Sequence, residues 1–200
     1  MKGKRTVIRT LDFGARKLTE LPKNKPEMHP SLGFRSIRIC LAMPQMFQSQ
    51  LRAIYRAACY GPVCILFPMV DSVEQLEEIL RHLQAARESL KRDKMVFDPQ
   101  VRVGLVIETP ASVILSRELA EKVDFFHIDT NDLVQYALAV DRRNPRVNSY
   151  YNTRHPAVMR MIEMVIDAAH TAGIKETVSR DRADDVRKLG WFIRTGVDGY

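Results

Sequence analysis

The sequence predicts an α/β fold in which parallel β-strands alternate with crossover helices. Three observations support this prediction: short apolar runs rich in β-branched residues, longer segments with helical periodicity between them, and polar residues directly after several of the runs. In folds of this class, ligands bind beyond the carboxyl ends of the strands. The 200 residues suffice for one sizeable core.

Six segments have strand character, in decreasing order of strength toward the end of the chain. The first four combine β-branched and aromatic residues, whereas the fifth, KETV, is short and the sixth is weaker still. They occupy residues 6–11, 63–67, 103–107, 124–128, 175–178 and 196–200.

Four segments with helical periodicity lie between these strands. Segment 71–90 places its apolar residues on one face, and Asp71 with Glu74 resembles a capping box at its start. Pro156 and Gly173 bracket another helix, because proline favours the first helical position and glycine the position after the last. Segments 48–61 and 110–123 complete the set. The apolar face of segment 71–90 consists of Val73, Leu76, Ile79, Leu80, Leu83 and Leu90.

Composition excludes several classes of protein. The 31 Lys and Arg residues against 24 Asp and Glu residues give a net charge of +7, but the positive residues are dispersed, so we expect no nucleic-acid partner. Nothing approaches the roughly 18 consecutive apolar residues of a membrane span, and Arg9 interrupts the first apolar stretch, so we expect no signal peptide and a cytoplasmic protein. Cys40, Cys59 and Cys64 lack a CxxC spacing, which predicts reduced thiols rather than a disulfide framework or a zinc site.

Carboxylates follow two neighbouring strands of the predicted sheet. Glu108 comes directly after strand 103–107, and Asn131 and Asp132 come shortly after strand 124–128. Two carboxylates at adjacent strand ends could share one Mg²⁺, which prefers carboxylate, water and phosphate oxygens. Each also has a structural alternative: Glu108 could be a neighbour of the helix cap before Pro110, and Asp132 could cap the helix that follows it.

Three arginines could supply the positive counterpart. Arg9 lies in the first strand, and Arg35 and Arg142 lie in connecting segments. Their forked guanidinium groups match phosphate and carboxylate groups. Alternatively, Arg9 is an edge-facing strand residue and Arg142 belongs to a solvated loop. His127, inside a strand, is interpreted as a hydrogen-bonded core residue rather than a ligand. Together the carboxylates and arginines indicate a metal-bridged, multiply anionic small molecule.

Several long blocks of the sequence resemble a known family. VIRTLDFG, PSLGFRSIRI, ILFPMVDSVEQL, VGLVIETPAS and VDFFHIDTNDLVQYALAVDRRN are similar to the phosphoenolpyruvate-binding barrel of enzyme I of the sugar phosphotransferase system. The resemblance runs from about Thr6 to Gly173. It implies a partial (β/α)8 TIM barrel of the phosphoenolpyruvate (PEP)-utilising type, roughly strands 3 to 8, in a single domain over residues 1–200 that is truncated at both ends.

The resemblance also implies a ligand and roles for named residues. The family binds PEP with Mg²⁺ at the carboxyl ends of its strands, and Glu108 and Asp132 match its metal ligands. Arg9 and Arg35 match the arginines that hold the phosphoryl group, whereas Asn131 and Arg142 match residues that hold the substrate. The phosphoryl group passes to a histidine on a separate domain and then to a histidine-containing phosphocarrier protein, which makes the family a transferase that serves sugar transport.

Three departures from the family pattern predict an impaired enzyme. Ser179 stands where the family has a catalytic cysteine that protonates the enolate, and an unactivated hydroxyl is a far poorer proton donor. Asp129 stands where glycine is usual and should repel an anionic ligand. Ala15 and Arg16 replace a glycine and an aspartate. We therefore expect the chain alone to be inactive, with Arg142 and Ser179 at the catalytic positions.

The expected truncation suggests a second interpretation. The histidine domain is missing from the 200 residues, and an incomplete barrel exposes strand edges that favour pairing with a missing segment or with a second copy. The family's barrel also dimerises. The alternative function is therefore a non-catalytic module that senses PEP or interacts with a related protein.

Overall fold

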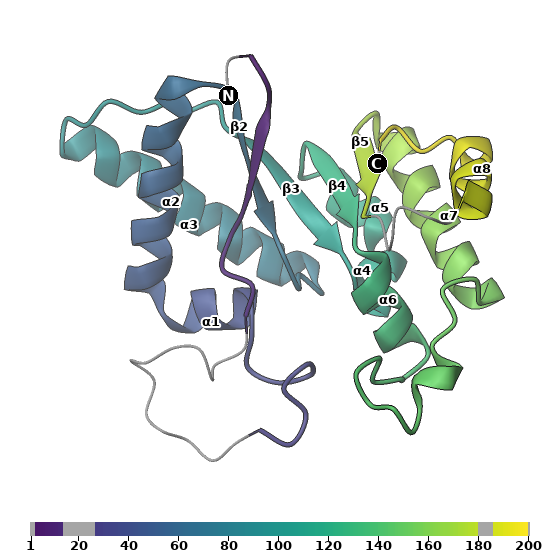
Figure 1. The fold of residues 1–200 in the computed structure, drawn as a ribbon. Coiled ribbons are helices and arrows are strands. Elements are labelled where there is room, and N and C mark those ends of the chain that lie inside the picture. Colours follow the sequence, from purple (N-terminus) through teal and green to yellow (C-terminus); the bar gives the residue numbers. More distant parts are fainter. Residues whose placement is uncertain (1–2, 14–26, 180–185, 200) are drawn as a thin grey trace. The chain divides into compact units, whose positions relative to one another are not determined.

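The computed structural model describes residues 3–13, 27–179 and 186–199, in which five strands alternate with helices (Figure 1). Contacts divide the chain into two compact units: residues 1–69 with 76–103, and residues 70–75 with 104–200. All the strand pairs within each unit are parallel, which confirms the predicted α/β class. That both units belong to the single domain predicted over residues 1–200 stays a prediction.

The first unit is built on one parallel strand pair. Strand β1 (Thr6–Arg9) pairs with β2 (Val63–Phe67) in the register Thr6↔Val63. Its helices are α1 (Ile37–Ala42), α2 (Pro44–Ala57), the 3-10 helix η2 (Ala58–Tyr60) and α3 (Val73–Arg92), whose first residues belong to the second unit. Gln48 of α2 donates to the His82 carbonyl of α3 at 2.9 Å, and Arg52 pairs with Asp93 at 2.8 Å. The core of this unit includes Phe47, Leu51, Ile65, Phe67, Leu76, Ile79, Leu83 and Leu90, all at most 2% exposed.

The start of α3 differs by one residue from the predicted capping box. Ser72, rather than Asp71, accepts the bond from the Gln75 N–H (3.2 Å), and Gln75, rather than Glu74, accepts from the Asp71 N–H (3.1 Å). The sequence offers both pairs at the same spacing, so spacing alone cannot choose between them. The predicted apolar face is buried at Leu76, Ile79, Leu83 and Leu90, whereas Val73 and Leu80 are half-buried.

The second unit contains three parallel strands. Strand β4 (Phe125–Ile128) lies between β3 (Arg102–Ile107) and β5 (Lys175–Val178), in the registers Gly104↔Phe125 and Phe125↔Lys175. Its helices are α4 (Pro110–Ile114), α5 (Ser116–Ala120), α6 (Thr130–Ala137), the 3-10 helix η3 (Asn148–Tyr150), α7 (Pro156–Ala172) and α8 (Val186–Thr195). The core includes Leu105, Ile107, Phe126, Ile128, Leu133, Val158, Ile162 and Val165, all at most 1% exposed.

The helices of the second unit confirm one prediction and modify another. Helix α7 begins at Pro156 and is followed by Gly173, whose φ of 69° is a left-handed conformation that glycine adopts without strain. The predicted helix over residues 110–123 is instead two short helices that meet at Leu115, whose φ and ψ of −91° and 12° leave the helical range. Helix α7 packs against α5, and Arg117 pairs with Asp167 across this contact at 2.8 Å.

The three cysteines are free thiols, as predicted. Cys40 and Cys64 are buried and Cys59 is exposed. Burial raises the pKa of Cys40 to about 12, so this thiol stays protonated and unreactive in the folded protein. Among the described residues, no helix is long and apolar enough to cross a membrane. The weak sixth strand is represented by a single bridge between Thr177 and Gly199.

Gly104 generates a stability prediction, because a Cβ atom at this buried position would overlap the ring of Phe125 on the neighbouring strand. We expect Gly104→Ala to lower the free energy of unfolding by about 1–3 kcal/mol through overpacking. Urea unfolding with linear extrapolation measures this change.

The matched control places the same substitution in a Phe125→Ala background, where the Cβ meets no ring. There Gly104→Ala should cost nothing, or stabilise by up to about 1 kcal/mol, because alanine restricts the unfolded chain more than glycine does. An equal cost in both backgrounds would show that the ring is not the cause.

Candidate functional site

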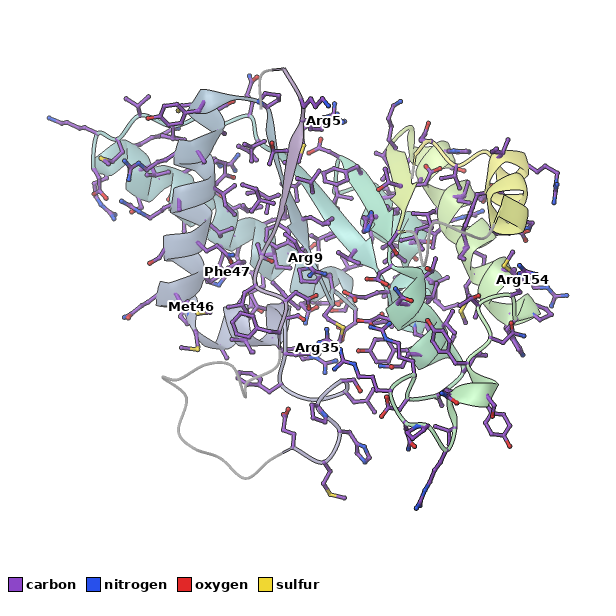
Figure 2. All side chains as sticks on the ribbon, in the orientation of Figure 1. Arg5, Arg9, Arg35, Met46, Phe47 and Arg154 are labelled. Carbon is purple, nitrogen blue, oxygen red and sulfur yellow. The ribbon has the colours of Figure 1, made fainter. Side chains whose placement is uncertain are left out.

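In the first unit, Asp12 holds two of the predicted arginines together. Its carboxylate accepts from Arg9 Nη1 at 2.7 Å and from Arg35 Nη2 at 3.2 Å. Figure 2 labels the two arginines. The Asp12 side chain is 9% exposed and that of Arg35 15%, whereas that of Arg9 is 47% exposed and so keeps donors in solvent. Arg9, on the edge strand β1, is therefore both half-exposed and paired with Asp12. The chain from β1 to α1 brings two guanidinium groups to one carboxylate, and such a pair can bind an anion.

Ser36 is a member of this cluster that the sequence analysis missed. Its buried hydroxyl donates to Asp12 Oδ1 and accepts from Arg35 Nε at 3.3 Å. Its φ of 53° is unusual for a residue other than glycine and costs about 1–3 kcal/mol. Such strain persists only where the surroundings enforce it, and here it directs the hydroxyl toward Asp12. The only sequence signal was a serine directly before an apolar helical segment.

In the second unit, Glu108 lies at the carboxyl end of β3 and is 1% exposed. The residue after it, Thr109, caps α4: Thr109 Oγ1 accepts from the Ser112 N–H at 3.1 Å, and Ser112 Oγ accepts from the Thr109 N–H at 3.2 Å. Thr109 is therefore the cap of α4 and Glu108 is its neighbour, as the structural alternative has it. Since Ile107 pairs with Ile128, Glu108 leaves the sheet at the same edge as the segment that leads into α6.

The N-terminus of α6 is capped by Asp129 and not by Asp132. Asp129 Oδ1 accepts from the backbone N–H groups of Asn131 at 2.9 Å and Asp132 at 3.3 Å. The Thr130 N–H donates to Ser179 Oγ at 3.2 Å, and the same hydroxyl donates to the Ile128 carbonyl at 3.2 Å. The first three N–H groups of α6, which would otherwise attract an anion, are thus occupied by the chain's own oxygens.

Asp132 lies in the first turn of α6 rather than at its cap. Asp132 is 6% exposed, and its Oδ1 accepts from Arg142 Nη2 at 3.0 Å. Arg142 Nη1 is buried and has no hydrogen-bond partner among the described residues. Gln135 Oε1 accepts from the Arg142 N–H at 3.3 Å and so holds the loop that carries this arginine. Arg142 therefore lies in a largely exposed loop but is held there by Asp132 and Gln135, and its buried Nη1 group is left without a partner among the described residues.

Two further contacts position the remaining predicted residues. Tyr151, which the sequence analysis missed, donates from its hydroxyl to Asn131 Oδ1 at 3.0 Å and fixes that amide. His127 Nδ1 lies 2.8 Å from Thr177 Oγ1, so this histidine is hydrogen-bonded as expected, but it is half-buried rather than part of the core. The structure brings together Arg9 with Arg35 and Asp132 with Arg142. Ala15 and Arg16 lie outside the described residues.

Comparison with known proteins identifies relatives along the whole chain. The family described as PEP-utilising enzyme, PEP-binding domain, matches residues 1–200. A phosphoenolpyruvate-protein phosphotransferase of Haemophilus influenzae is 40% identical over 203 residues, which cover 100% of this chain and 35% of the relative. The chain thus spans about a third of that protein's length.

Among solved structures, two show a similar fold. An aldolase/citrate lyase family protein from Burkholderia cenocepacia has a TM-score of 0.53 at 18% identity. This match covers 77% of this chain and 60% of the Burkholderia chain. Malate synthase from Haloferax volcanii has a TM-score of 0.54 at 14% identity. This match covers 78% of this chain and 46% of the malate synthase chain. At these identities the likeness concerns the fold alone, and it agrees with the predicted partial barrel.

The cap of α6 generates a prediction about ligand affinity. Asp129→Asn keeps a good cap but removes a negative charge, so we expect affinity for PEP, the ligand that the sequence resemblance predicts, to rise about tenfold, or about 1.4 kcal/mol. Isothermal titration calorimetry measures this change.

The matched control is Asp141→Asn, which removes the same charge from an exposed side chain that accepts from the Arg143 N–H at 2.9 Å. We expect this control to leave the affinity unchanged. An equal gain in both variants would mean that net charge, rather than the occupied helix end, is responsible.

Proposed function

Because this chain belongs to the PEP-utilising enzymes, whose PEP-binding domain it matches over residues 1–200, we propose that it binds PEP together with Mg²⁺. The observation that carries the proposal is the Asp132–Arg142 pair, in which a nearly buried carboxylate lies beside a guanidinium group with a buried, unpaired donor. A carboxylate and a free donor side by side suit a ligand that is an anion bridged by a metal ion.

The donor chemistry of the second unit fits Mg²⁺. Glu108 and Asp132 are 1% and 6% exposed, and both offer the hard carboxylate oxygens that Mg²⁺ prefers. In the proposed complex Glu108 and Asp132 hold the ion, Arg142 Nη1 donates to the ligand, and Tyr151 keeps the Asn131 amide oriented toward it. The metal, when bound, neutralises charge on the phosphoryl group.

For the whole reaction we propose the role of a PEP–protein phosphotransferase domain. The P–O bond of PEP breaks, a P–N bond to a histidine on a separate domain forms, and the enolate takes up a proton to give pyruvate; a carrier protein then receives the phosphoryl group. Arg9 and Arg35 are proposed to hold the phosphoryl oxygens, and the resemblance supports this assignment. The phosphoryl transfer, the histidine domain and the carrier protein belong to the proposal, since this chain covers 35% of the length of its relative.

The metal assignment is tested by Glu108→Gln, which preserves the size of the side chain and removes its charge. We expect Mg²⁺-dependent binding of PEP to weaken at least about tenfold, which corresponds to about 1.4 kcal/mol. Titration calorimetry with and without Mg²⁺ measures the loss. Glu118→Gln, at an exposed position of α5, is the matched control and should bind like the unmodified chain. Undiminished Mg²⁺-dependent affinity in Glu108→Gln would refute the site.

A second candidate function is a non-catalytic module that senses PEP or pairs with a related protein. The observation that favours it is the state of the α6 N-terminus, whose N–H groups are bonded to Asp129 and Ser179. The Ser179 hydroxyl donates to a backbone carbonyl, so it is held away from the role of a free proton donor. On this proposal the chain recognises the ligand but does not complete the transfer.

Ser179→Cys distinguishes the two candidates. If the chain is a disabled phosphotransferase, the thiol should restore proton transfer, and PEP-dependent phosphorylation of an added histidine domain should rise at least about a hundredfold. Mass spectrometry of the phosphorylated domain measures it. Cys59→Ser in the same background controls for the exposed native thiol. No gain, with PEP binding intact, would favour the sensing module.

A further inference from the structure

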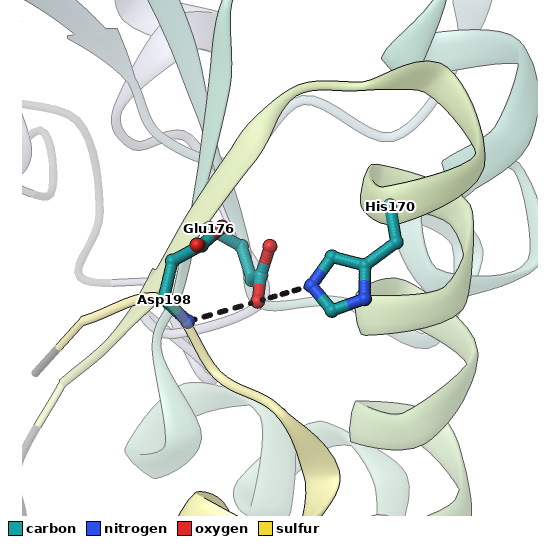
Figure 3. Close-up of side chains that lie close together, drawn as sticks. All are labelled: His170, Glu176 and Asp198. Atoms are coloured by element: carbon teal, nitrogen blue, oxygen red, sulfur yellow. Dashed lines mark hydrogen bonds and ion pairs between the residues drawn. The ribbon is translucent and has the colours of Figure 1, made fainter.

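A second cluster of potential ligands lies apart from the residues discussed above. It consists of His170 in the last turn of α7, Glu176 in β5 and Asp198 after α8 (Figure 3). One ligand atom from each residue lies within 4.8 Å of the others. Among the described residues, this is the one group of three or more histidine, cysteine or acidic side chains close enough to hold a metal ion.

Three backbone features fix the positions of these residues. The left-handed Gly173 ends α7, so that β5 begins only two residues later and His170 and Glu176 are held on a short connection. The Val178 N–H donates to the Gly199 carbonyl at 3.1 Å, which places Gly199 alongside β5. The Asp198 N–H then donates to Glu176 Oε1 at 3.2 Å. The cluster is therefore preorganised by the fold.

Glu176 supplies an observation that is independent of the clustering. Its side chain is fully buried, and Oε1 accepts from the Asp198 N–H and lies 3.3 Å from His170 Nε2. Oε2 is also buried but has no hydrogen-bond partner among the described residues. Figure 3 shows this carboxylate directed at the His170 ring. A buried carboxylate oxygen without a partner is costly, and a bound cation is one way to remove this cost.

The mixture of donors selects the class of cation. One imidazole nitrogen with two carboxylates suits Zn²⁺ and similar transition ions, whereas Mg²⁺ and Ca²⁺ prefer sites made of oxygen atoms alone. Ligands about 2.1 Å from one Zn²⁺ in tetrahedral geometry are about 3.4 Å apart. His170 Nε2 and Glu176 Oε1 are 3.3 Å apart, close to this value, and an Asp198 oxygen lies within 4.8 Å of the other two ligand atoms.

The site also has a route for entry. The side chains of His170 and Asp198 are 46% and 32% exposed, so solvent reaches the cluster from outside while Glu176 closes its inner side. Lys175 Nζ lies 3.9 Å from Asp198 Oδ1, but this lysine is 71% exposed, and a solvated pair of this length is weak competition for a metal ion.

We propose that His170, Glu176 and Asp198 form a Zn²⁺ site that fastens the segment after α8 to β5. Three protein ligands leave one tetrahedral position for water. The competing explanation is a simple imidazolium–carboxylate pair, in which protonated His170 supplies the positive charge and no metal binds. The two explanations differ in whether the chain takes up Zn²⁺ at a defined stoichiometry.

The first test is a calorimetric titration of the full, metal-free chain with Zn²⁺, in excess Mg²⁺ so that hard oxygen sites are already filled. We expect one Zn²⁺ per chain, and at least tenfold weaker binding in Glu176→Gln and in His170→Gln. His29→Gln, an exposed histidine of the first unit, is the control and should bind like the unmodified chain. No saturable binding, or equal binding in all variants, would overturn the proposal.

The second test uses Co²⁺ as a spectroscopic probe. Its variant is His170→Gln, so the result does not require Glu176→Gln to fold. His170→Gln changes a half-exposed side chain, and circular dichroism verifies that its fold is kept. We expect d–d absorption bands of a low-coordinate Co²⁺ complex in the unmodified chain and their loss in His170→Gln. Identical spectra would exclude histidine ligation and support the imidazolium–carboxylate pair. The Glu108→Gln variant should keep the bands, which separates this site from the proposed PEP site.

Discussion

The start of α6 must find acceptors for its first backbone N–H groups, and the arrangement of the second unit depends on how it does so. Oxygen atoms of Asp129 and Ser179 take these donors, one from each side of the turn. Asp129 performs the capping. The Asp132 carboxylate therefore pairs with Arg142, and the Asn131 side chain accepts a hydrogen bond from the Tyr151 hydroxyl. A single local requirement for hydrogen bonds thus determines the partners of the Asp129, Asn131 and Asp132 side chains.

Internal hydrogen bonds to the first N–H groups of α6 favour folding but disfavour the binding of an anion there. A helix whose first N–H groups are satisfied internally is well capped, which favours folding. An anion that approaches the same end meets a carboxylate instead of open donors. The first unit shows the reverse arrangement, because Asp12 pairs with both arginines while Arg9 remains 47% exposed and able to accept a second anion. The Asp129 carboxylate occupies backbone donors, whereas the Asp12 carboxylate holds two guanidinium groups together.

Much of the fold was predictable because its signals are local. Strands β2 and β5 have the predicted bounds, and Pro156 and Gly173 delimit α7 as expected, since each of these signals involves a few adjacent residues. The family resemblance, carried by long blocks, is confirmed by the match over residues 1–200.

The site was less predictable because its contacts depend on backbone angles and long-range packing. Asp129 and Asp132 are chemically equivalent as caps, and only the extended conformation of Asp129 decides between them. Tyr151 reaches Asn131 across 20 residues, a distance in sequence that no local pattern encodes. The ligand cluster at His170, Glu176 and Asp198 depends on a return of the chain end to β5, where the sequence offered only the weakest strand signal.

The positive φ of Ser36 has a consequence for how this protein can evolve. Glycine at this position would relieve the backbone strain, but it would remove the hydroxyl that joins Arg35 to Asp12. A lineage selected only for thermal stability would therefore be drawn toward glycine, whereas one selected for anion binding would retain serine. The residue found at this position in a homologue would reveal which of the two pressures has acted on it.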